Sequence, residues 1–443
     1  MKRETIRIGM ISLGCSKNQV DAERLLAVFR DQGWVLTPEI ENCDVVVVNT
    51  CGFIEDAKRE SIEAILEAAG SNKKGQPRRV VVTGCLAERY RSELAEEMPE
   101  ADAVLGIGCN ADIVSAVRQV LAGERVVRFG PKEALSLEGD RVLTDGDYTA
   151  YVKVAEGCDN RCSYCAIPLI RGSFRSRPLE NVVSECRALA ARGVKEINLV
   201  AQDTTRYGLD LYGEARLPEL LRQVCAIEEL RWVRVLYCYP DRVTDALLDE
   251  MARQPKVCRY LDIPVQHGSA KVLREMNRRG DRADILALAA RIREKLPGAV
   301  LRTTVITGFP GETEEDFTEL CSLVQEARFD RLGCFVYSRE EDTPAGERED
   351  QVDPKTARRR ADIVMELQQG IAFELSESQV GRTLEVLVEG RRGRRYVGRS
   401  YMDAPDIDTR VLFDSEKKCL PGDFIHVIIE KADGYDLFGR AVE

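Results

Sequence analysis

The sequence predicts an α/β protein with three domains, because two long stretches alternate apolar runs with helical patterns and a third carries only short β-like runs. Residues 1–130 predict an open parallel sheet of the Rossmann or flavodoxin type. Residues 148–350 predict six strand–helix units, which form an open (β/α)6 partial barrel rather than a closed one. Residues 376–443 predict a small antiparallel β-barrel.

In the first domain, apolar runs predict three buried parallel strands, at residues 6–13, 45–48 and 80–82. An amphipathic helix is expected between the last two strands, because apolar residues recur there at helical spacing. They are Ile62, Ile65, Leu66 and Ala69.

A cysteine closely follows each of these strands: Cys15, Cys51 and Cys85. Parallel sheets bind their ligands at the carboxyl ends of the strands, so we expect the three thiols to converge there as a metal site. A single cysteine in such a loop is more often a structural residue, and the prediction depends on the repeated placement. Cys43 and Cys109 lack this placement and are expected to be structural.

The second domain carries six strand-like segments, at residues 151–154, 197–200, 233–237, 260–264, 302–307 and 332–337. Helical patterns separate them, for instance at residues 179–192 and at 314–327, where Thr313 is the expected N-cap. The functional face of such a barrel lies at the carboxyl ends of its strands.

Two segments connect the domains. Residues 131–147 are irregular and polar and predict a linker, whereas residues 351–375 carry a helical pattern that predicts a connecting helix. The β-like runs of the last domain are residues 384–388, 411–413, 424–429 and 437–442.

The most informative local motif is Cys158, Cys162 and Cys165, with the spacing C-x3-C-x2-C. A structural zinc site usually has four ligands. Thiolates also suit iron–sulfur clusters, and in a [4Fe–4S] cluster three cysteines leave one iron open for a small molecule. This spacing resembles that of radical S-adenosylmethionine enzymes. The alternative is three unrelated cysteines in one loop.

Composition restricts the class of protein. The chain has 64 Lys+Arg and 75 Asp+Glu, and its net charge of −11 argues against a protein that chiefly binds nucleic acid through phosphates. Its 15 cysteines and the lack of any long apolar segment predict a cytoplasmic protein with metal ligands rather than disulfides, and no membrane partner.

Taken together, the three domains and the two cysteine sets resemble the methylthiotransferases over the whole chain. The resemblance implies two [4Fe–4S] clusters, one held by Cys158, Cys162 and Cys165 and the second by Cys15, Cys51 and Cys85. It also implies S-adenosylmethionine as radical initiator and methyl donor, and a terminal barrel of the TRAM type. Catalysis would then depend on the cofactors rather than on a side-chain acid or base.

The resemblance further implies that Tyr164 lies beside the adenine of S-adenosylmethionine. Gly308 and Gly311 match the family's glycine-rich segment near the ribose and methionine, although a plain tight turn explains them equally well. Gln202 and Gln266, at strand ends, are expected to meet the polar groups of the same cofactor.

Within this family one branch modifies an aspartate of ribosomal protein S12 and another modifies isopentenyladenosine in tRNA. Four segments resemble the ribosomal-protein branch: 201–208 (AQDTTRYG), 239–245 (YPDRVTD), 262–267 (DIPVQH) and 337–341 (YSREE). Residues 371–443 contain 11 Lys+Arg and 14 Asp+Glu, whereas a tRNA-binding module should be basic. A basic cluster in this region would favour tRNA unless it is only a solvated hairpin turn. Its members are Arg391, Arg392, Arg394 and Arg395.

The expected partners are therefore ribosomal protein S12, an electron donor such as flavodoxin or ferredoxin, and a sulfur source. The tRNA enzyme is the alternative within the same chemistry. A non-catalytic ribosome- or RNA-binding protein with structural metal sites is the alternative from another class.

Overall fold

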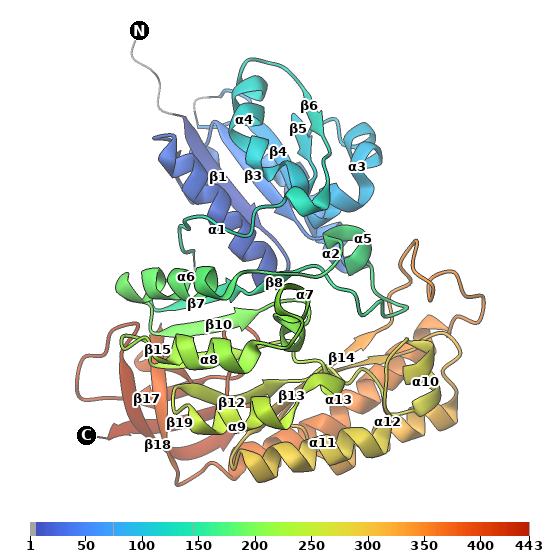
Figure 1. Ribbon diagram of the computed structural model, residues 1–443. Coiled ribbons are helices and arrows are strands. Elements are labelled where there is room, and N and C mark those ends of the chain that lie inside the picture. The colour runs from blue at the N-terminus through green and yellow to red at the C-terminus, as the bar shows by residue number, and fades with distance from the viewer. Residues whose placement is uncertain (1–5, 74, 145, 443) are drawn as a thin grey trace.

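The computed structural model describes residues 6–73, 75–144 and 146–442 (Figure 1). Its N-terminal sheet has six parallel strands in the order β2-β1-β3-β4-β5-β6. They are β1 (Arg7–Ser12), β2 (Val35–Leu36), β3 (Val45–Thr50), β4 (Arg79–Gly84), β5 (Ala103–Leu105) and β6 (Val126–Arg128). The predicted open parallel sheet is confirmed. Strands β2, β5 and β6 were missed because runs of two or three residues show no clear period.

The helices of this domain are α1 (Ser16–Asp31), α2 (Glu55–Ala68), α3 (Cys85–Glu97) and α4 (Ile113–Leu121). The predicted apolar face of α2 is wrong, because Ile62 and Leu66 are 38% and 47% exposed. The face built around Ile65 is buried instead. Ser61 lies on this buried face and accounts for the way the helix is turned about its axis. Its hydroxyl donates to Cys51 O (2.8 Å) and accepts from Cys51 N (2.9 Å).

The central sheet has six parallel strands in the order β14-β13-β12-β11-β10-β7, as predicted. They are β7 (Thr149–Lys153), β10 (Glu196–Val200), β11 (Trp232–Val235), β12 (Val257–Asp262), β13 (Val300–Thr307) and β14 (Arg331–Val336). The short strands β8 (Ala155–Glu156) and β9 (Arg175–Ser176) pair beside it.

The helices after the N-terminal domain are α5 (Ile167–Arg171), α6 (Leu179–Ala191), α7 (Leu209–Tyr212), α8 (Leu217–Cys225), α9 (Asp245–Arg253), α10 (Ala270–Glu275), α11 (Arg282–Lys295), α12 (Glu314–Ala327) and α13 (Pro354–Glu377). The predicted N-cap of α12 is present, because the Thr313 side chain accepts from Asp316 N at 3.2 Å. Within the described ranges no helix combines the length and the apolar character needed to cross a membrane.

The C-terminal domain is a closed barrel of five strands in the order β15-β16-β17-β19-β18. They are β15 (Thr383–Arg392), β16 (Arg395–Ser400), β17 (Val411–Asp414), β18 (Phe424–Asp433) and β19 (Asp436–Val442). The prediction of a wholly antiparallel barrel is wrong, because β17 and β19 are parallel. A closed ring with an odd number of strands must contain a parallel pair. The predicted arginine-rich hairpin turn joins β15 to β16.

The C-terminal barrel and the N-terminal domain both pack on the central domain (Figure 1). Tyr151, Trp232 and Tyr260 of the central sheet share one apolar cluster with the core of the terminal barrel. Within this contact, Arg399 Nη2 donates to buried Glu196 Oε2 at 2.6 Å. Val20 of α1 belongs to the same apolar cluster. The first turns of α1 therefore enter the carboxyl end of the open barrel.

Candidate functional site

The loop that carries Cys158, Cys162 and Cys165 follows β8 and precedes α5. Its base is closed by a hydrogen bond from Cys158 N to Gly172 O at 3.1 Å. Gly157 has φ of +75°, and a Cβ atom there would lie 2.2 Å from Ser173 O. Only glycine fits this close approach, so the residue before the first cysteine fixes where the loop begins.

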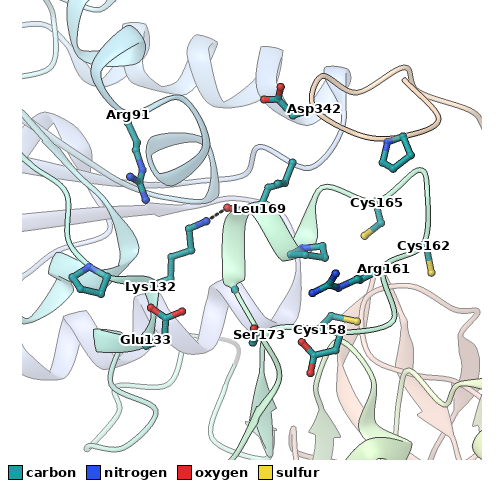
Figure 2. Close-up of a pocket in the computed structure, with 15 residues that line it drawn as sticks. Arg91, Lys132, Glu133, Cys158, Arg161, Cys162, Cys165, Leu169, Ser173 and Asp342 are labelled. Carbon is teal, nitrogen blue, oxygen red and sulfur yellow. Dashed lines mark hydrogen bonds between the residues drawn. The ribbon is translucent and has the colours of Figure 1, made fainter. Parts of the chain in front are cut away.

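All three thiols of this loop are free and line an open cavity of about 580 Å³ next to the N-terminal domain (Figure 2). Arg91 of α3 and Lys132 of the segment that follows β6 also line the cavity. Burial raises the pKa of Cys158 to about 11, and the pKa of Cys165 is raised further for the same reason.

The sulfur of Cys162 lies 3.7 Å from Tyr239 Oη and 3.8 Å from Arg278 Nη1. Among the described residues, no group of three or more His, Cys, Asp or Glu side chains is arranged so that it could hold a metal ion. Three free thiols in one short loop nevertheless fit the donor set of an iron–sulfur cluster, and metal binding would displace their protons.

The other predicted cysteines follow three adjacent strands of the N-terminal sheet. Cys15 is the N-cap of α1, Cys51 directly follows β3, and Cys85 is the first residue of α3. A Cβ atom on Gly14, next to Cys15, would lie 2.8 Å from Cys51 Sγ, so these two loops touch. Burial and the neighbouring Cys85 raise the pKa of Cys51 to about 12.

Cys15 differs from its neighbours because it is exposed. Desolvation of the thiol raises the pKa of Cys15, but the positive charges of Lys17 and Arg171 outweigh this effect and lower the pKa. The structure therefore brings the three strand-end loops together beside two cations. That the thiols jointly hold a cluster stays a prediction.

Arg171 joins the two cysteine sets, and sequence reasoning missed it. This residue ends α5, the short helix that follows Cys165, and its side chain is 2% exposed. Its Nη2 donates to Cys85 Sγ at 3.3 Å, and its Nη1 donates to Asp21 Oδ2 at 2.6 Å. One arginine from the central domain thus contacts both a candidate metal ligand and α1 of the N-terminal domain.

The buried charges around Arg171 form a paired network. Lys153 Nζ lies 2.6 Å from Asp21 Oδ1 and also pairs with Glu156, which lies 3.3 Å from Arg171 Nη1. Against the opposing effect of desolvation, Lys153 and Arg171 hold the pKa of Glu156 well below its ordinary value. Since Glu156 lies just before the cysteine loop and Arg171 just after it, the network fixes both ends of the loop.

We predict that Arg171→Met lowers the free energy of unfolding by about 3–5 kcal/mol, because Asp21 and Glu156 lose a buried partner. Urea denaturation of the cluster-free protein measures this change. The matched control is Arg187→Met on the exposed face of α6, expected within about 0.5 kcal/mol of the parent. Equal stability of the two variants would contradict a structural role for the network.

Gln202 and Gln266 each present a buried side-chain oxygen without a hydrogen-bond partner among the described residues. Gln202 Nε2 donates to Glu156 Oε1 at 2.9 Å, which orients its amide at the end of β10. Gln266 adopts φ of +70°, an unusual conformation for a residue with a side chain. Unsatisfied buried acceptors call for a donor, and the polar groups of S-adenosylmethionine would supply one.

Tyr164, Gly308 and Gly311 occupy the same edge of the central sheet but contact protein atoms. Tyr164 packs beside Met276 and Phe309, and burial raises its pKa well above the ordinary value. A Cβ atom on Gly308 would lie 2.2 Å from Ala357 Cβ, and one on Gly311 would lie 2.6 Å from Arg348 Nη2. These contacts explain both glycines as tight packing, and their contact with a cofactor stays a prediction.

Three family models match successive parts of the chain. They are "Uncharacterized protein family UPF0004" over residues 7–106, "Radical SAM superfamily" over residues 152–324 and "TRAM domain" over residues 380–442. A protein of Pelotomaculum thermopropionicum called "Ribosomal protein uS12 methylthiotransferase RimO" is 50% identical over 441 residues, which is 99% of each chain. The chain belongs to the RimO family.

A second RimO protein, from Lachnoclostridium phytofermentans, is 47% identical over 439 residues and covers 98% of this chain and 100% of its own. Among solved structures, the radical S-adenosylmethionine methyltransferase TsrM of Kitasatospora setae superposes with a TM-score of 0.57 at 14% identity, covering 88% of this chain and 79% of that one. That similarity concerns the fold alone.

Membership of the RimO family confirms the resemblance to the methylthiotransferases. The radical SAM match covers the loop of Cys158, Cys162 and Cys165, and the match to UPF0004 covers Cys15, Cys51 and Cys85. Together the two matches imply that a RimO-type chain uses S-adenosylmethionine and iron–sulfur chemistry.

Proposed function

We propose that this chain replaces a C–H bond of an aspartate in ribosomal protein uS12 by C–S–CH3. Full-length relatives named for this activity support the substrate. The observation that carries the proposal is the bridge made by Arg171. Because it leaves the loop of one cysteine set and contacts Cys85 of the other, it holds the two sets at one junction.

The proposed cofactors are S-adenosylmethionine and two [4Fe–4S] clusters, one on Cys158, Cys162 and Cys165 and one on the N-terminal set of Cys15, Cys51 and Cys85. When bound, they would supply the radical that removes hydrogen from the target carbon and the methylthio group that replaces it. A flavodoxin or ferredoxin would donate electrons, and a separate sulfur source would be consumed.

The chain's own residues would bind and orient the cofactor and the substrate and shield them from water. Gln202 and Gln266 offer unpaired acceptors to S-adenosylmethionine, and Tyr164 adds an aromatic ring within the cysteine loop. Val20 of helix α1 packs against apolar residues of the central sheet and would limit the access of water to that side of the site. No side-chain acid or base is assigned, because the aspartate methylene is too weak an acid for proton abstraction.

The charge of the terminal barrel favours a protein substrate over tRNA. Residues 371–443, which are the end of α13 and the barrel, carry 14 acidic and 11 basic side chains. The absence of a basic excess suits a basic ribosomal protein better than a polyphosphate. Arg391 and Arg395 of the hairpin stack on Tyr396 and Phe438 of the barrel itself.

Parallel anaerobic reactions test the proposal. Reconstituted enzyme, S-adenosylmethionine and a reductant are combined with either a uS12 peptide or isopentenylated tRNA, and products are identified by mass spectrometry. We expect a methylthio group on the peptide and release of 5′-deoxyadenosine. Modified tRNA with an unchanged peptide would assign the tRNA branch, and no cleavage of S-adenosylmethionine would favour a non-catalytic protein.

A further inference from the structure

Lys17 places a buried positive charge near Cys15, at the carboxyl edge of the central sheet. It is the second residue of α1, lies two positions after Cys15, and is 7% exposed. Its ammonium nitrogen lies 3.3 Å from the centroid of the Tyr237 ring. Tyr237 follows β11 at the carboxyl edge of the central sheet. A cation of the N-terminal domain therefore projects into the mouth of the barrel.

No Asp or Glu oxygen of the described residues lies within 4.0 Å of the Lys17 ammonium. The carboxylate that influences it is Asp262, which already accepts from Arg302 Nη1 at 2.9 Å and from Tyr237 N at 3.1 Å. The groups that face Lys17 are thus a thiol, a phenol and a carboxylate engaged elsewhere.

Other buried cations around this junction have partners. Lys153 and Arg171 both pair with Asp21, and Arg278 donates to Pro264 O at 2.5 Å. A buried ammonium that pairs with no carboxylate is costly unless another anion lies near it. Lys17 differs from these cations because no carboxylate of the described residues pairs with it, so an anion from outside the chain would stabilise it.

The backbone next to Lys17 is also unusual. Tyr237 adopts φ of +61°, in the left-handed region that residues with side chains rarely enter. Its carbonyl accepts from Thr204 N at 3.0 Å and its amide donates to Asp262, so both sides of the residue are held. Such strain tends to collect at ligand-binding sites. Here the strained residue is the one whose aromatic ring lies under the ammonium.

We propose that Lys17 binds the side-chain carboxylate of the target aspartate. The inference rests on the proposed function, which puts the aspartate between the two cysteine sets. The carbon that reacts is bonded directly to that carboxyl group. When this carbon lies near Cys15, the carboxylate would therefore lie near an ammonium two residues away from Cys15. A neutral nucleobase has no charged group that would form an ion pair with it. Lys17 is thus a specificity residue for an acidic side chain.

A binding cycle tests this role. Affinities of dye-labelled uS12 peptides with Asp or Asn at the target position are measured for reconstituted enzyme with S-adenosylmethionine and no reductant. We expect the parent to prefer the Asp peptide by about tenfold or more. Lys17→Met should bind both peptides equally, Lys17→Arg should keep part of the preference, and the surface control Lys73→Met should match the parent.

Iron content and 5′-deoxyadenosine yield establish that each variant is loaded, and Lys17→Gln replaces Lys17→Met if the latter loads poorly. A loaded neutral variant that keeps the full Asp preference would overturn the inference, and so would a parent without any preference. Product formation by the parent on the Asp peptide is scored separately. Its absence would count against the proposed function rather than against the assignment of Lys17 alone.

Discussion

Cys165→Ser is expected to abolish 5′-deoxyadenosine formation and product formation together. A serine hydroxyl is a hard, weakly acidic group and does not replace a thiolate in an iron–sulfur cluster. With only Cys158 and Cys162 left in the loop, the cluster that activates S-adenosylmethionine should not assemble. Chromatography of anaerobic reactions measures 5′-deoxyadenosine, and iron analysis measures cluster content.

The matched control is Cys321→Ser in α12, a half-buried cysteine outside both sets. It should retain both iron and activity. Cleavage of S-adenosylmethionine at the parent rate by Cys165→Ser would show that the loop does not hold the radical cluster. Loss of activity in Cys321→Ser as well would point to general damage by cysteine replacement.

Cys85→Ser is expected to separate the two halves of the reaction. The loop of Cys158, Cys162 and Cys165 stays intact, so 5′-deoxyadenosine should still form. The methylthio product should fall below detection, because Cys85, which accepts from Arg171 Nη2 at 3.3 Å, is a proposed ligand of the N-terminal cluster. Iron content should fall to that of a single cluster. Mass spectrometry of the peptide and iron analysis measure these changes.

Cys109→Ser is the control for this variant, because Cys109 is buried in the same domain but does not follow β1, β3 or β4. It should keep both products. If Cys85→Ser still methylthiolated the peptide, the N-terminal set would not serve the reaction as proposed. If it also stopped 5′-deoxyadenosine formation, the two sets would not be separable.

The parts of the site that lie close together in the sequence could be predicted from it. Cys158, Cys162 and Cys165 lie within eight successive positions, and their spacing alone indicates an iron–sulfur cluster of the radical S-adenosylmethionine type. Cys15, Cys51 and Cys85 required one further step, because parallel strands bring their carboxyl ends to a common edge. Six strands of the central sheet were also readable as apolar runs.

The contacts between domains could not be predicted in this way. Arg171 and Asp21 are 150 positions apart and look like ordinary surface residues, since charged side chains are rarely buried without a partner. Lys17 likewise stands out only when Tyr237 lies beneath it. The parallel pair of β17 and β19 follows from closing five strands into a ring, which periodicity does not reveal.

The most direct test of the proposed function uses S-adenosylmethionine labelled with deuterium in its methyl group. The reconstituted enzyme is reduced anaerobically with full-length uS12, and tandem mass spectrometry locates the label. The proposed function predicts a deuterated methylthio group on one aspartate, together with 5′-deoxyadenosine. Label on another residue type, or 5′-deoxyadenosine with unmodified uS12, would contradict it.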